Sequence, residues 1–65
     1  MTKMEVERRR REWSQADLAE LADLSQPDIS AFENGWRKPY PSQALRLAKA
    51  LRLKASELTE DASVA

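Results

Sequence analysis

The side chains able to do chemistry in this sequence are amides, hydroxyls, carboxylates and cations, because it contains no histidine and no cysteine. Their absence removes thiol nucleophiles, imidazole bases, disulfides and the common zinc sites. The carboxylates are spaced as on the solvated faces of helices. Because a chain of 65 residues is too short to enclose a deep pocket, we expect no enzyme activity, no cofactor and no metal site.

One cluster of polar and cationic side chains suits the binding of phosphate. Asn34, Arg37 and Lys38 lie within a stretch of five residues. A loop amide and two cations can hydrogen-bond to phosphate oxygens. Pro39 and Pro41 stiffen the segment that follows and end any helix before it. This loop is therefore a candidate for contact with a nucleic-acid backbone.

Two helices must position this loop, and a repeated Ser-x-x-Asp pattern marks where each begins. The serine of Ser14/Asp17 or Ser25/Asp28 can accept from free N–H groups of the first turn, and the acid can reach back to the serine N–H. The starts are eleven residues apart, which leaves room for one helix over about residues 15–22 and a turn. The second helix covers about residues 26–33 and ends at Asn34-Gly35. Two short helices joined by a tight turn form a helix-turn-helix.

Three more helices complete the expected fold, an all-α bundle of five short helices. We expect them at residues 2–11, at 42–51 and from about residue 55, because glycine, proline and β-branched residues are rare. Helical spacing predicts an inward face. Its expected members are Trp13, Leu18, Ala19, Ala22, Ile29, Phe32, Ala44, Leu45, Ala48, Leu51, Leu53 and Leu58.

Length and charge bound the organisation of the chain. We expect one domain over residues 1–60 and a short flexible acidic tail over 61–65. The net charge is zero, but segments 1–11, 12–33, 34–54 and 55–65 carry +3, −6, +6 and −3. Any basic footprint for a nucleic acid must therefore come from the segments flanking the helix-turn-helix. No apolar run approaches the length of a membrane span, and we expect a cytoplasmic protein.

Beyond these local patterns, the chain resembles the lambda-repressor-like helix-turn-helix family, also called the Cro or XRE family. The register holds without a gap from about residue 8 to residue 58, and no single residue is diagnostic. The matching residues are Ser14, Gln15, Leu18, Ala19, Ser25, Ile29, Glu33, Gly35, Pro39, Ala48, Leu51 and Leu58.

The resemblance implies a DNA-binding protein whose helix over residues 26–33 enters the major groove. Outward side chains of that helix would face base edges, and Gln26 could bond twice to adenine. The implied base contacts are Gln26, Pro27, Ser30 and Ala31. The implied phosphate contacts are Gln15, Ser25, Asn34, Trp36, Arg37 and Lys38.

Four residues depart from the pattern of this family. Glu7 stands where the family usually has an apolar residue. Glu12 stands where the family has glycine, which predicts a non-glycine residue in a strained turn. Trp13 replaces an aliphatic core residue. Trp36 replaces a polar residue, and three roles stay open for it: packing on a sugar, contact with a partner subunit, or folding over its own loop.

Double-stranded DNA is the expected partner, bound as a homodimer on a two-fold site, because one small domain buries too little DNA to bind tightly and specifically. The candidate dimer surfaces are the loop over residues 36–40 and the region over residues 53–58. The alternative is a protein-interaction module on the same fold, whose acidic block docks on a basic partner.

Arg8 and Glu33 are expected to form a structural ion pair. Glu33 lies near a helix C-terminus, where an acid is unfavourable against the helix dipole and requires a cation. Residues 12–33 contain no Lys or Arg, so the cation must come from elsewhere. Arg8 lies on the same face of its helix as Met1 and Met4, and the planar guanidinium can bridge a carboxylate twice.

Overall fold

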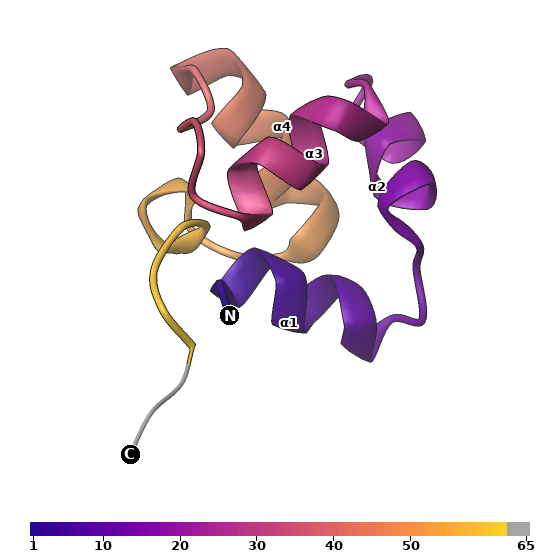
Figure 1. The fold of residues 1–65 in the computed structure, drawn as a ribbon, viewed down its shortest axis with the longest axis horizontal. Coiled ribbons are helices and arrows are strands. Elements are labelled where there is room, and N and C mark those ends of the chain that lie inside the picture. The colour runs from indigo at the N-terminus through magenta and orange to yellow at the C-terminus, as the bar shows by residue number, and fades with distance from the viewer. Residues whose placement is uncertain (63–65) are drawn as a thin grey trace.

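The computed structural model describes residues 1–62 and is all-helical, as the sequence predicts, although the number of α-helices is smaller. Four α-helices surround one core (Figure 1), and the predicted fifth helix is a single 3-10 turn. A helix could not extend there, because Thr59 and Glu60 turn back toward the N-terminus. The elements are α1 (Lys3–Arg10), α2 (Gln15–Leu21), α3 (Gln26–Glu33), α4 (Pro41–Leu51) and η1 (Ala55–Glu57).

Both Ser-x-x-Asp patterns form capping boxes. Asp17 N donates to Ser14 Oγ over 3.0 Å, and Ser14 N donates back to Asp17 Oδ2 over 2.8 Å. Asp28 N donates to Ser25 Oγ over 3.2 Å, and Ser25 N to Asp28 Oδ2 over 3.4 Å. The starts of α2 and α3 are therefore determined by local sequence, as predicted.

Each of the four α-helices is followed, one or two residues after its end, by a residue in the left-handed backbone region. The φ angles of these residues are 57° at Glu12, 56° at Asp23, 74° at Gly35 and 57° at Arg52. The next N–H bonds to a carbonyl five residues back, at distances of 2.8–3.2 Å. This arrangement satisfies carbonyls in the last helical turn. Three of these four positions lack glycine, so each non-glycine end carries backbone strain.

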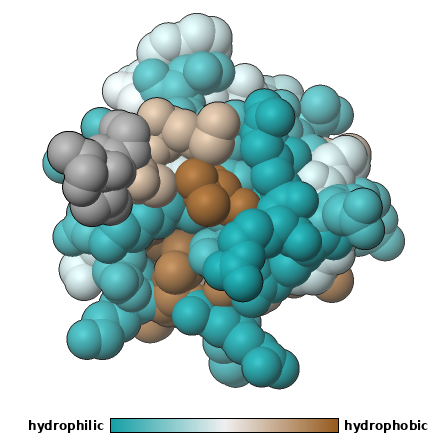
Figure 2. All heavy atoms as spheres, turned by 90° about the horizontal axis from the view of Figure 1, so that it is seen from below, coloured by the Kyte–Doolittle hydropathy of each residue, from teal (hydrophilic) through white to brown (hydrophobic). Residues whose placement is uncertain are grey.

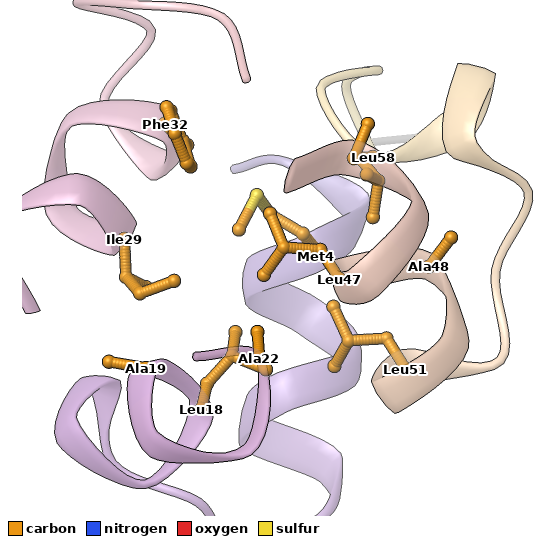
Figure 3. Packing of buried hydrophobic residues seen from close by; sticks show 11 residues of the cluster. Met4, Leu18, Ala19, Ala22, Ile29, Phe32, Leu47, Ala48, Leu51 and Leu58 are labelled. Carbon is orange, nitrogen blue, oxygen red and sulfur yellow. The ribbon is translucent and has the colours of Figure 1, made fainter. Parts of the chain in front are cut away.

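The core lies between the four helices and is closed by η1 (Figure 3). Met4 comes from α1, Leu18 from α2, Ile29 and Phe32 from α3, and each is fully buried. Leu58, just after η1, is also fully buried. Every helix therefore contributes apolar side chains to a single cluster, and the inner face of α3 packs in that cluster.

One core position of α4 differs from the prediction made from the sequence, which was wrong there. Leu45 is 65% exposed, and Leu47 is fully buried in its place. Successive helical residues are about 100° apart, so Leu47 lies about 40° from Leu51 and about 60° from Ala44, on the inner face. Leu45 lies about 60° beyond Ala48, on the outer edge of the helix.

The two ends of the described chain are hydrogen-bonded to each other. Lys3 N donates to Glu60 O, Met4 N to Leu58 O and Ala62 N to Met1 O, over 2.8–3.1 Å. Asp61 forms an isolated bridge with Thr2. The first residues of the expected tail are thus bonded to the N-terminus, and residues 63–65 lie outside the described residues.

The outer surface of α1 is polar and its charges are paired along the helix. Glu7 accepts from Arg11 and Arg10 over 2.7 and 3.0 Å, and Arg9 pairs with Glu5. Figure 2 views the molecule from the side on which α1 lies, and hydrophilic residues surround a smaller apolar area there. These arginines therefore form no unpaired basic face.

Candidate nucleic-acid interface

The outer face of α3 carries the four residues expected to contact bases, and none of the four is charged. Gln26 and Pro27 are exposed, and Ser30 and Ala31 are half-buried. Ile29 and Phe32 point the opposite way into the core, with no exposed surface. One side of α3 therefore presents an amide, a hydroxyl and two small apolar groups to solvent, while the opposite side is buried in the core.

Three of the six acidic residues in the block over residues 12–33 have structural roles. Asp17 and Asp28 belong to the two capping boxes, and Glu33 is buried. Glu12, Glu20 and Asp23 are exposed on other elements. The acidic block of residues 12–33 thus places no free carboxylate on the outer face of α3.

Glu33 is the centre of a buried network that joins α1, α2 and α3. Arg8 Nε donates to Glu33 Oε2 over 2.7 Å and Arg8 Nη2 to Oε1 over 3.1 Å, the two-bond contact expected from the sequence. The side chains of Arg8 and Glu33 are 9% and 2% exposed. The hydrogen bond to Glu33 is the main cause that raises the pKa of Arg8. Arg8 Nη1 also donates to the carbonyl of Trp13 over 2.8 Å.

Gln15 belongs to this network, a role that sequence analysis missed. Its Nε2 donates to Glu33 Oε1 over 3.0 Å. The side chain expected to bind phosphate is therefore held by a buried carboxylate at the start of α2. No signal in the sequence shows this contact, because Gln15 and Glu33 meet only when α2 packs on α3.

Arg37 is also held in place by a residue of α3. Its guanidinium donates to Asp28, and its Cζ lies 4.9 Å from the centre of the Phe32 ring. The hydrogen bond with Ser25 and then that with Arg37 lower the pKa of Asp28 below its ordinary value of 3.8. Arg37 thus packs along α3, while about 42% of its side chain remains exposed.

The rest of the loop after α3 is exposed. Asn34 Nδ2 donates to Ser30 Oγ over 3.3 Å, which couples an expected phosphate contact to an expected base contact. Lys38 is exposed and forms no ion pair within residues 1–62. Trp36 is 76% exposed, so it does not fold over its own loop. The remaining two roles for Trp36 both require a partner molecule.

The described part of the chain contains neither a cluster of metal ligands nor a helix suited to span a membrane. Among residues 1–62 no three His, Cys, Asp or Glu side chains cluster in a way that could hold a metal ion. Within the same residues no helix has both the length and the apolar character needed to cross a membrane.

Comparison with known proteins places the chain in a family. Residues 4–60 match the family model described as a helix-turn-helix domain. The match covers α1 from its second residue and all of α2, α3, α4 and η1. A search of curated protein sequences finds no match for this chain.

Proposed function

Because the chain belongs to the helix-turn-helix domain family, we propose that it is a DNA-binding transcriptional regulator of the lambda-repressor-like type. In this proposal α2 and α3 are the helix-turn-helix and α3 enters the major groove of double-stranded DNA. Such a regulator would act in the cytoplasm. The chain needs no cofactor or catalytic residue for this role.

The outer face of α3 is the observation that carries the proposal. Gln26 and Ser30 can hydrogen-bond to base edges, and Pro27 and Ala31 can contact the methyl group of thymine. None of these four side chains carries a charge. Reading bases requires a helix held in a defined position, and the buried Arg8–Glu33 pair supports that requirement.

Phosphate contacts are proposed for the residues on both sides of that face. Gln15 and Ser25 are at the starts of α2 and α3, where N–H groups and helix dipoles favour anions. Asn34, Trp36, Arg37 and Lys38 follow the end of α3 and would lie along the same DNA strand. In this role Arg37 uses the part of its guanidinium that Asp28 leaves exposed.

A dimer on a two-fold operator completes the proposal. One domain of 65 residues presents one short recognition helix, and two copies double the contacts. The loop over residues 36–40 is a candidate surface for this dimer because Trp36 and Tyr40 are 76% and 66% exposed. The region over residues 53–58 is the other candidate.

Titration against random duplex DNA at several salt concentrations tests the proposal. If about four phosphates are neutralised per subunit, the logarithm of the binding constant should fall with the logarithm of salt at a slope near −3 to −4. Lys38→Ala should reduce that slope by about one in magnitude. Arg10→Ala, which removes a 72% exposed cation of α1 outside the proposed contacts, is the matched control and should leave the slope unchanged.

Absence of duplex binding at low salt would reject the proposal. If a basic protein partner were bound instead, the chain would be a protein-interaction module on the same fold. Both acids of α3 are already engaged, Asp28 with Arg37 and Glu33 with Arg8. The acids left for such a partner are those of α2 and the turn after it.

A further inference from the structure

A groove between α2 and α4 has no role in the proposed DNA contacts. Its volume is about 420 Å³, and its apolar walls are Trp13, Leu21, Ala22 and Ala50. A second hollow of about 360 Å³ continues from it, and the two share Trp13 and Leu21. Leu21 is 58% exposed on the wall of this groove. A large apolar side chain is therefore kept in solvent where the surface is concave.

The two rims of the groove carry opposite charges. Asp17, Glu20 and Asp23 come from α2 and the turn after it, and Arg46 and Lys49 come from α4. Arg46 Nε donates to the carbonyl of Ala22 over 2.8 Å, which ties the two rims together. The groove is thus an apolar strip with an acidic edge and a basic edge.

In the described part of the chain, four charges on these rims are unpaired, whereas the acids of α1 and of η1 are paired. Within residues 1–62, Glu20, Asp23, Arg46 and Lys49 form no ion pair. The acids of α1 and of η1 pair with nearby cations. Complementary charges thus face solvent on both sides of one apolar strip.

From these observations we propose that the groove is a self-association surface, covered by the same groove of a second copy of this chain. A two-fold axis parallel to the groove brings the acidic rim of each copy onto the basic rim of the other. An axis across the groove would instead oppose acid to acid and base to base. The charge pattern therefore selects one symmetric arrangement, in which Leu21 and Trp13 of both copies become buried.

This surface is separate from the proposed DNA interface. None of the residues proposed to contact bases or phosphates lines either hollow. Two copies joined through the groove would leave both α3 helices uncovered at that contact. Association is therefore tested without DNA, and its result is independent of DNA binding.

Sedimentation velocity from micromolar to millimolar concentration measures the association. We expect a concentration-dependent dimer that Glu20→Lys and Lys49→Glu each weaken about tenfold or more, because both symmetric contacts change from attraction to repulsion. Mixing the two variants should restore the dimer, since each of the two symmetric contacts then again joins one acid to one base. Both changes are on exposed helix surface, and circular dichroism checks that the variants fold.

Matched variants outside the groove control for simple attraction between oppositely charged proteins. Glu12→Lys and Arg10→Glu change the net charge by the same amounts at exposed residues that do not line the groove. Mixing these two should produce no additional dimer. For the apolar strip, Leu21→Gln should weaken association, and Leu45→Gln, at a leucine that is 65% exposed elsewhere on α4, should not.

Three results would overturn the proposal. One is a monomer at all concentrations. Another is association that the groove variants leave unchanged, which would place the contact on a different surface. The third is growth into oligomers larger than a dimer, because head-to-tail contact, unlike two-fold contact, does not close.

Discussion

At the scale of single residues, Glu33 links α1, α2 and α3 through its carboxylate. One carboxylate accepts from Arg8 of α1 and from Gln15 of α2 while belonging to α3 itself. Each oxygen is satisfied, and no buried side-chain polar atom among the described residues lacks a partner. Removing one member leaves the others buried and uncompensated.

Glu33→Ala should therefore lower the free energy of unfolding by about 3 kcal/mol or more, because it leaves the Arg8 charge buried and unpaired. An exposed pair would contribute less than about 1 kcal/mol. Thermal unfolding of Glu33→Ala, Arg8→Ala and the double variant measures the coupling. Additive losses would show that the two side chains do not act as a pair.

Gln26 is the residue expected to carry base identity. Gln26→Ala should reduce the preference at one base pair of the operator by about 1–3 kcal/mol. Gln15→Ala and Asn34→Ala should weaken binding to all sequences alike, because contacts to phosphate carry no sequence information. Competition assays with operator variants measure both effects, and an unchanged ranking for Gln26→Ala would contradict the assignment.

At the scale of elements, backbone strain is found just after the C-terminal ends of the helices. Each α-helix is followed by a residue in the left-handed backbone region, and only after α3 is that residue a glycine. Glu12 combines two unfavourable features, because it has a side chain at φ 57° and a negative charge near the C-terminus of α1.

Glu12→Gly should accordingly raise the free energy of unfolding, by about 0.5–1 kcal/mol after allowance for the greater freedom of glycine in the unfolded chain. Arg52→Gly should gain less, because its positive charge is favourable at the end of α4. Chemical denaturation measures both changes. The converse control is Gly35→Ala, where an added Cβ meets no atom within 4 Å. It should cost about 1 kcal/mol through φ alone.

At the scale of the whole molecule, stability should depend on acid pH through carboxylates that accept from cations. The pKa of Glu7 is lowered chiefly by its hydrogen bond with Arg11, and that of Asp28 chiefly by Ser25 and then Arg37. A lowered folded pKa means that the contribution is present above the ordinary pKa. It is lost as the pH falls through the folded value.

Asp28→Asn isolates one of these carboxylates. The variant should be less stable than the natural sequence above the ordinary Asp pKa of 3.8. The difference should shrink as the pH falls below that value, since a protonated Asp28 no longer pairs with Arg37 as a charge. Melting temperatures of both proteins across this range provide the measurement. A difference that stays constant with pH would contradict an ionised Asp28 as the stabilising group.

The sequence by itself determined where α2 and α3 begin and where α3 ends. Ser14/Asp17 and Ser25/Asp28 act over three residues, and Gly35 acts on its own backbone, so packing is not needed to decide their effect. The Arg8–Glu33 pair was also predictable, because the acidic block has no cation of its own and so requires one from outside.

For the remaining residues, only the tertiary structure decided which helix face each one lies on and which partner it contacts. Leu45 and Leu47 both fit a helical pattern with Ala44, and packing against the other helices selected Leu47. Gln15 and Arg37 were free to point at solvent until the folded chain brought Glu33 and Asp28 within reach. The groove combines Leu21 with Lys49, which lie on separate helices. A helix-capping hydrogen bond joins neighbours along the chain, whereas these contacts depend on how whole helices are packed.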